Sequence, residues 1–99
     1  MSEENKRLEC KITGRVQMVM FRDFTNKTAR KLGLTGMVRN MPDGSVYIIA
    51  EGEEEKLREL VEKLKSGPLF ARVDHVEEKF LPATGEFKNF MIDFYGNKI

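Results

Sequence analysis

The residues best suited to chemistry lie in two short segments of the chain. The first runs from Gly14 to Arg22 and reads GRVQMVMFR, and the second runs from Gly36 to Gly44 and reads GMVRNMPDG. The first segment ends a strand-like run and opens a helix-like one, so it puts backbone N–H groups and Arg22 at a helix N-terminus. These N–H groups lack partners within the helix, and the helix dipole favours negative charge beside them. Together with Asn40 in the second segment, they predict a small phosphate-binding site.

Such a site is suited to phosphoryl transfer. That chemistry requires the protein to hold the phosphoryl group, offset its charge and place a nucleophile in line with it. A loop of backbone N–H groups can form a concave anion site without a metal, and the planar guanidinium of an arginine meets two phosphate oxygens at once. The dipole disfavours an arginine in the first turn of a helix unless an anion lies there, which favours Arg22 as a phosphate ligand. Asn40, considered alone, is more typical of a turn-capping residue.

The elements that must position these residues follow from the apolar pattern. Strand-like runs cover 7–13, 34–40, 45–51, 72–80 and 90–95. Apolar residues recur at helical spacing in 22–32, which Gly33 ends, and in 53–65, which Gly67 and Pro68 end. The turn Pro42-Asp43-Gly44 between two strand-like runs is a strong hairpin signal.

This order of elements predicts the fold class. It reads β-α-β-β-α-β, with one further strand near the end. We therefore expect an α+β protein with the ferredoxin-like split β-α-β sandwich, in which two helices cover one face of an antiparallel sheet of four to five strands. Ninety-nine residues leave room for one hydrophobic core, so we expect a single domain over 1–99 with its core at about 8–95. The fold hosts many functions and does not indicate one by itself.

Composition narrows the class of protein further. The chain is 40% hydrophobic and 33% charged, which is typical of a soluble globular protein. Its net charge of +1 counts against a nucleic-acid partner. No apolar run approaches the roughly 20 residues that span a membrane, and residues 1–7 lack the apolar core of a secretory signal. The single cysteine cannot form an internal disulfide. We expect a cytoplasmic monomer without a membrane partner.

The two segments, in this order, resemble those of the acylphosphatase family. Its members share a strand–loop–helix of the form G-R-V-Q-G-V-x-F-R, followed by G-x-V-x-N-x-x-D-G. Glu51-Gly52 before the second helix and Gly67-Pro68 after it are further points of similarity, so the resemblance covers roughly residues 8–95. It implies a hydrolase that cleaves the carboxyl–phosphate anhydride of an acyl phosphate to a carboxylate and inorganic phosphate. Water is the nucleophile, and no metal or other cofactor is implied.

The resemblance also assigns roles to residues. Arg22 clamps the phosphate and the side-chain amide of Asn40 orients the attacking water. The phosphate group of the substrate, or a phosphate or sulfate ion, lies in a cradle made by the backbone of six loop residues: Arg15, Val16, Gln17, Met18, Val19 and Met20. The side chain of Arg15 is more typical of a loop or salt-bridge residue than of a substrate contact.

Met18 departs from the family, which has glycine at this position. Glycine suits a backbone with positive φ or a close approach to a ligand, whereas a methionine in left-handed geometry costs on the order of 1–2 kcal/mol. Either the loop keeps its shape and carries the strain, which reduces activity, or it re-routes and turns N–H groups away from the phosphate. Met20 is a milder departure, because that family position varies. The alternative function is therefore a catalytically weakened domain that binds an anion or a partner.

The remaining reactive side chains favour structural roles. We expect His75 to be an ordinary strand residue, Cys10 to be a packed core thiol, and the acidic run 51–55 to start the second helix rather than bind a cation. The aromatic residues of the C-terminal third could stack on nucleic-acid bases, but their alternation places about half of them in the core, and the strand 45–50 lacks the basic-aromatic pattern of RNA-recognition modules.

Overall fold

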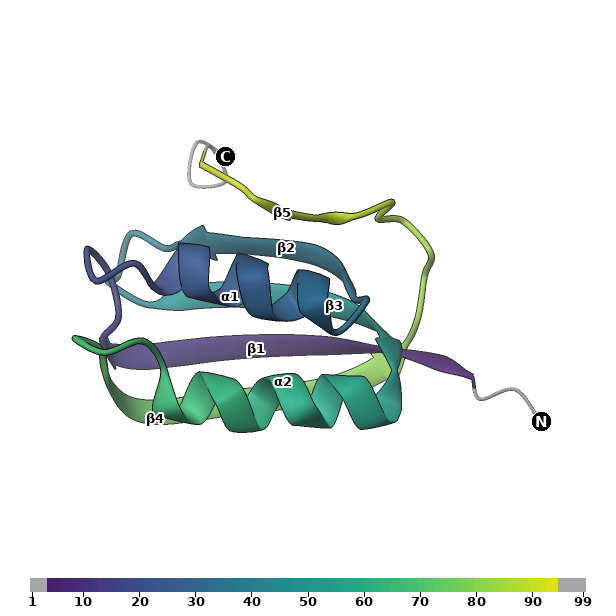
Figure 1. Ribbon diagram of the computed structural model, residues 1–99, viewed down its shortest axis with the longest axis horizontal. Coiled ribbons are helices and arrows are strands. Elements are labelled where there is room, and N and C mark those ends of the chain that lie inside the picture. Colours follow the sequence, from purple (N-terminus) through teal and green to yellow (C-terminus); the bar gives the residue numbers. More distant parts are fainter. Residues whose placement is uncertain (1–3, 95–99) are drawn as a thin grey trace.

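Two helices cover one face of a five-stranded sheet in the computed structural model, which describes residues 4–94 (Figure 1). The elements are, in chain order, β1 (Asn5–Arg15), α1 (Phe21–Lys31), β2 (Thr35–Asn40), β3 (Val46–Glu53), α2 (Glu54–Ser66), β4 (Arg72–Pro82) and β5 (Phe90–Ile92). The predicted fold class is confirmed. The helix and strand boundaries differ from the predicted ones by a few residues at most. The last strand ends at Ile92, and Tyr95, which the prediction included, lies outside the described residues.

The sheet has the strand order β4-β1-β3-β2-β5. The pairs β1–β3, β1–β4 and β2–β3 are antiparallel, but β5 runs parallel to β2 through Gly36↔Phe90, Met37↔Met91 and Val38↔Ile92. The sheet is therefore mixed, which corrects the prediction of an antiparallel sheet. The reason is the connection after β4, which crosses from one edge of the sheet to the other and enters beside β2 in the same direction (Figure 1).

The core lies between the sheet and the helices. Leu8, Cys10 and Ile12 of β1 are buried as their alternation predicts, and the buried stripe of α2 consists of Leu57, Leu60, Val61 and Leu64. Burial, aided by the charge of Glu78, raises the pKa of the Cys10 thiol to about 12, so Cys10 stays a neutral core side chain, as expected. Neither described helix is long and apolar enough to cross a membrane.

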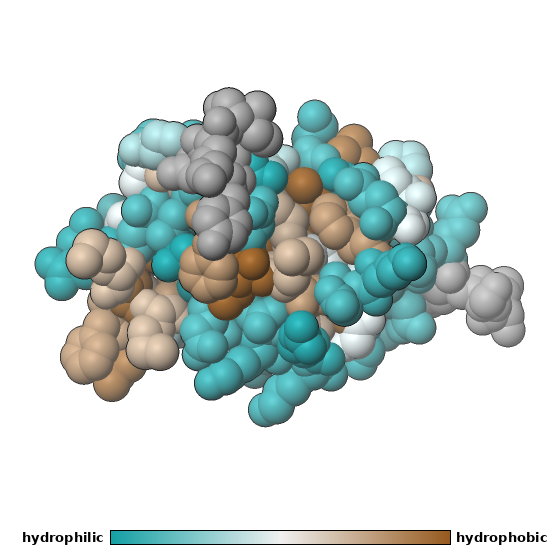
Figure 2. Space-filling view, turned by 90° about the horizontal axis from the view of Figure 1, so that it is seen from above, coloured by the Kyte–Doolittle hydropathy of each residue, from teal (hydrophilic) through white to brown (hydrophobic). Residues whose placement is uncertain are grey.

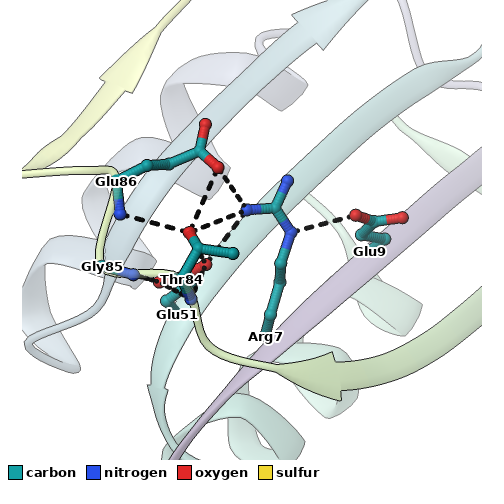
Figure 3. A network of polar contacts seen from close by, with 6 residues as sticks. All are labelled: Arg7, Glu9, Glu51, Thr84, Gly85 and Glu86. Atoms are coloured by element: carbon teal, nitrogen blue, oxygen red, sulfur yellow. Dashed lines mark hydrogen bonds and ion pairs between the residues drawn. The ribbon is translucent and has the colours of Figure 1, made fainter.

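A polar network holds the connection between β4 and β5 against the sheet (Figure 3). Its centre is the buried carboxylate of Glu51 in β3, which lies 3.0 Å from Nη1 of Arg7 and accepts hydrogen bonds from the backbone N–H groups of Thr84 and Gly85 at 3.0 and 2.9 Å. Arg7 also reaches Glu86 at 2.8 Å. The sequence predicts that the acidic run 51–55 starts the second helix, and for Glu51 this is wrong. Strand β3 extends to Glu53, and α2 begins at Glu54.

Glu51 makes the stability of the fold sensitive to acid. Burial raises the pKa of this carboxyl, but hydrogen bonds from Gly85, Thr84 and Arg7 outweigh burial and hold the pKa below its usual value. A carboxyl with a lowered folded-state pKa stabilises the protein above its unfolded-state pKa of about 4.3, and that contribution is lost as the pH falls through the folded-state value. The network is therefore intact at neutral pH and weakens in acid.

We expect Glu51→Gln to lower the free energy of unfolding at pH 7 by about 2 kcal/mol, because an amide cannot satisfy all the donors that converge on the carboxylate. Below the unfolded-state pKa of about 4.3 the difference between the variant and the parent should shrink, because the contribution of ionised Glu51 to the parent's stability is lost as the pH falls toward the folded-state pKa. Urea titrations at pH 7, 4 and 3 check this. The control is Glu59→Gln, an exposed residue of α2. Equal losses in the two variants at pH 7 would contradict the assignment.

Candidate active site

The loop between β1 and α1 joins the end of a strand to the start of a helix at one end of the molecule, on the left in Figure 1. Within residues 4–94, the backbone N–H groups of residues 17–22 make no hydrogen bond. Val16 anchors the loop in the core at 1% exposure, whereas the side chains of Met18 and Met20 are 99% and 71% exposed. The loop thus combines a fixed base with unpaired donors beside the positive end of the α1 dipole.

Both methionines have left-handed backbone conformations, with φ of 63° at Met18 and 66° at Met20. Of the two outcomes that the sequence leaves open at Met18, the structure has the first, in which the loop stays left-handed at this position. A non-glycine residue in this region costs about 1–2 kcal/mol. Met20, which the sequence treats as the milder departure, has the same type of backbone as Met18.

The side chain of Gln17 ties this loop to the turn between β2 and β3. Its Nε2 donates hydrogen bonds to the carbonyls of Met41 and Ser45 at 2.9 and 2.8 Å. The turn is closed by Asp43, whose Oδ1 accepts hydrogen bonds from the backbone N–H and the hydroxyl of Ser45 at 2.9 and 2.6 Å. Those bonds and Lys11 hold the pKa of Asp43 far below its usual value. The sequence assigns Gln17 only a backbone role; its side-chain partners are 24 and 28 residues away, so no local pattern indicates them.

Asn40 ends β2 directly before this turn. Its side-chain Oδ1 is buried and has no hydrogen-bond partner among the residues that the structure describes. Asp43, rather than Asn40, caps the turn, so the turn-capping alternative for Asn40 has no hydrogen bond of Oδ1 to support it. An unpaired buried carbonyl oxygen costs about 1–3 kcal/mol, and native proteins retain few of them. The orphaned oxygen therefore points to a donor that binds at this place.

Arg22 lies in the first turn of α1, beside the loop. Its guanidinium carbon lies 5.0 Å from the ring centroid of Phe94, which is a cation–π arrangement. Within residues 4–94 no carboxylate forms an ion pair with Arg22, and the neighbouring Asp23 pairs instead with Lys27 at 3.1 Å. A cation without a neutralising partner at the positive end of a helix is electrostatically unfavourable, and an anion bound there would relieve this.

The two predicted catalytic residues meet in one depression of about 570 Å³. Its lining comes from the loop, the first turn of α1, the last residues of β2 and β5, and one residue after β5. These residues are Val16, Met18, Met20, Phe21, Arg22, Asp23, Asn40, Ile92 and Phe94. Its volume is within the range of small-molecule sites.

Three of the predicted loop residues do not line this depression, namely Arg15, Gln17 and Val19. Arg15 is exposed at the end of β1 and lies opposite Arg72 in the β1–β4 ladder. The lining therefore includes Val16, Met18 and Met20 of the predicted cradle, and the backbone contacts of the other three with the phosphate remain predictions. Phe94 is the functional candidate that the sequence missed as a site residue, because its position over Arg22 depends on the parallel pairing of β5, which no local pattern indicates.

Comparisons with known proteins agree with this geometry. The profile of the acylphosphatase family matches residues 8–92. An acylphosphatase of Caldanaerobacter subterraneus subsp. tengcongensis is 45% identical over 87 residues, which are 88% of this chain and 97% of that protein. An acylphosphatase of Marinobacter nauticus is 52% identical over 79 residues, which are 80% of this chain and 86% of that protein.

The fold comparison gives the same family. The crystal structure of acylphosphatase from Bacillus subtilis superposes with a TM-score of 0.86 at 35% sequence identity, covering 89% of this chain and 98% of that one. A profile match over most of the chain, relatives above 40% identity along most of their length and a close superposition on a solved acylphosphatase lead to one conclusion: the chain belongs to the acylphosphatase family.

Proposed function

We propose that this member of the acylphosphatase family hydrolyses acyl phosphates in the depression between the loop 15–20, Arg22 and Asn40. The bond cleaved is the carboxyl–phosphate anhydride, and the products are a carboxylate and inorganic phosphate. Water supplies the oxygen that replaces the acyl oxygen on phosphorus. The carboxylate is a good leaving group, so the reaction does not need a strong general base in the site.

The phosphoryl group lies in the backbone cradle in this proposal. The unpaired N–H groups of residues 17–20 donate to its oxygens, and Arg22 adds a charge-assisted fork. Arg22 lacks a carboxylate partner within the described residues, so its charge is available to offset the charge of the phosphoryl oxygens. Electrostatic groups placed in advance act on the transition state without reorganising during the reaction, which is how a site without a nucleophilic side chain accelerates phosphoryl transfer.

The attacking water is held by Asn40. The buried Oδ1 of Asn40 accepts a hydrogen bond from this water, which satisfies the orphaned acceptor and directs a lone pair of the water at phosphorus. The link from Gln17 to Met41 and Ser45 fixes the distance between the cradle and Asn40. Among all these contacts, the unpaired oxygen of Asn40 in the same depression as Arg22 is the observation that carries the proposal.

Hydrolysis of benzoyl phosphate by the purified protein, in a buffer with a chelator, tests the proposal. We expect turnover well above the uncatalysed rate, unaffected by the chelator. Phosphate binding without turnover would favour the second candidate, a domain that kept the anion site and lost catalysis. The specific observation behind that candidate is the pair of left-handed methionines in the loop, because the strain that they carry lowers the free energy available for binding the transition state.

The strain at Met18 leads to a prediction about rate. We expect Met18→Gly to raise kcat/KM about threefold to tenfold, because glycine adopts the left-handed backbone without the cost of a Cβ atom and holds the N–H groups in place. Steady-state kinetics with acetyl phosphate measure the change, because its small acyl group makes the rate depend on the loop backbone and not on apolar contact with the side chain at position 18. Met18→Ala is the matched control: it removes the thioether but keeps the Cβ atom, so it should not raise the rate as glycine does. An unchanged or lower rate for Met18→Gly would refute the proposed effect of strain.

We also propose that the protein acts as a monomer in the cytoplasm and needs no cofactor. The buried Cys10 thiol is a free cysteine, which is compatible with a reducing compartment. Size-exclusion chromatography with light scattering tests the oligomeric state.

A further inference from the structure

We infer that the acyl group of the substrate is bulky, uncharged and apolar, and that Met18, Met20 and Phe94 bind it beside the phosphate cradle. The inference rests on the proposed function, because it places the phosphate of the same molecule against Arg22. It concerns the part of the depression that neither the cradle nor Asn40 uses.

Three large apolar side chains face solvent at this depression. Met18, Met20 and Phe94 are 99%, 71% and 62% exposed, and all three line the depression that contains Arg22 and Asn40. Exposed apolar side chains scattered singly need no explanation, but a group of them around a polar centre is typical of a ligand site. The pattern matches a ligand with one anionic end and one apolar end.

The apolar surface continues beyond the depression. Leu69 and Phe70, in the loop after α2, are 88% and 74% exposed, and this loop lies at the same end of the molecule as Met18 and Met20 (Figure 1). Pro68 of this loop lines one groove together with Met20 and Phe24, and the same groove also carries Lys27, Arg30 and Lys31. Figure 2 shows apolar side chains gathered at this end, which is on the left in both views. An acyl group larger than the depression would therefore still meet apolar surface.

Within the depression itself, the charges do not favour a second anionic group on the acyl side. Arg22 and Asp23 are the charged residues among those that line it. Arg22 is committed to the phosphate, and Asp23 would repel a carboxylate or a second phosphate on the acyl chain. Because Asp23 already pairs with Lys27 at 3.1 Å, it offers little to a cationic acyl group either. The part of the acyl group that lies in the depression is therefore expected to be uncharged and apolar.

The chemistry of the side chains supports the same class. Methionine has three rotatable bonds and a polarisable sulfur, so two methionines can adapt to acyl groups of different shape, and sulfur contacts aromatic rings favourably. At Met18 this side chain occurs where the backbone disfavours it, at φ 63°. Contact with an apolar acyl group would offset the strain in the substrate complex. This explains how an unfavourable side chain at the mouth of the site can serve binding.

The test compares two substrates that differ in the acyl group only, benzoyl phosphate and acetyl phosphate. The measured quantity is the ratio of their kcat/KM values, because a general loss of catalysis cancels in the ratio. We expect Met18→Asn and Phe94→Ala each to lower this ratio about fivefold relative to the parent, from the loss of apolar contact. Asparagine tolerates left-handed backbone, so Met18→Asn removes the apolar side chain while keeping the loop geometry.

Met91→Asn is the matched control, because Met91 is also exposed but lies in β5 and does not line the depression. Its ratio should stay within about twofold of the parent's. If turnover occurs and the ratio is the same in the parent and all three variants, the apolar subsite is refuted while the hydrolase function stands.

Binding of two non-hydrolysable anions separates the inference from the proposed function. Phenylphosphonate and methylphosphonate carry the same anionic head and lack the anhydride bond. We expect the parent to bind phenylphosphonate about tenfold more tightly by calorimetry, and Met18→Asn to lose most of that preference. If neither acyl phosphate is hydrolysed but this preference is observed, the proposed function fails and the apolar subsite stands. Equal affinities of the parent for the two phosphonates would overturn the subsite.

Discussion

Replacing Arg22 with alanine is expected to lower kcat/KM for benzoyl phosphate about a thousandfold. The substitution removes the cationic side chain that lines the depression beside the loop and has no ion-pair partner within residues 4–94. Loss of one preorganised donor to a developing charge typically costs a hundredfold to a thousandfold, and an arginine that contacts a transferring phosphoryl group contributes at least as much. Arg22→Lys should recover a small part of the rate, because an ammonium keeps the charge but lacks the planar fork.

Arg58 provides a matched control for Arg22. Its guanidinium carbon lies 4.8 Å from the ring centroid of Phe80, so it has a cation–π contact similar to that of Arg22 with Phe94, but it is on the exposed face of α2 and pairs with Glu54. Arg58→Ala should leave kcat/KM within about twofold of the parent's value, since exposed pairs contribute little to stability. A loss of less than tenfold in Arg22→Ala, or equal losses in the two variants, would contradict the role of Arg22.

Replacing Asn40 with alanine is expected to lower kcat about a hundredfold while KM changes little, because Asn40 is proposed to orient the water and not to hold the phosphate. Unlike the rate, the stability of the Asn40→Ala variant should not fall. The variant loses a buried Oδ1 that has no partner within the described residues, so the free energy of unfolding should stay the same or rise by about 1 kcal/mol. A residue that costs stability and supports rate is characteristic of a functional site.

Steady-state kinetics and urea unfolding on the same sample check both parts of this prediction. The control is Asn26→Ala, because Asn26 is on α1 away from the depression and accepts a hydrogen bond from Arg30 at 3.3 Å. A destabilised Asn40→Ala variant with normal kcat would mean that Asn40 serves the turn between β2 and β3, and the water-orienting role would be wrong.

Local patterns in the sequence were sufficient to predict the helices and strands and their order along the chain. The period of two in β1 and the helical period in α2 arise from burial on one face, and burial acts on each segment separately. The partner of a strand is not a local property. The three residues of β5 could have joined the sheet in either direction, and the parallel pairing with β2 follows from the long connection after β4, which Glu51 and Arg7 hold against the sheet.

For the site, the resemblance to the acylphosphatase family implied that Arg22 and Asn40 act together, and the structure brings both to one depression. Their roles remain predictions until they are tested. The side-chain link from Gln17 and the ring of Phe94 over Arg22 could not be foreseen, because both join residues far apart in the chain. The burial of Glu51 could not be predicted from the acidic run 51–55 either. Its partners come from β1 and from the connection before β5, which are far away in the chain.

Hydrolysis of benzoyl phosphate in water enriched in oxygen-18 tests the central claim most directly. The claim is that water held at Asn40 attacks phosphorus while Arg22 and the loop hold the phosphoryl group. It predicts enzymatic turnover with the label in inorganic phosphate and none in benzoate, and loss of that turnover in both Arg22→Ala and Asn40→Ala. Label in benzoate would show attack at the carbonyl carbon, and the absence of turnover above the uncatalysed rate would show that the site does not perform the reaction; either result would contradict the account.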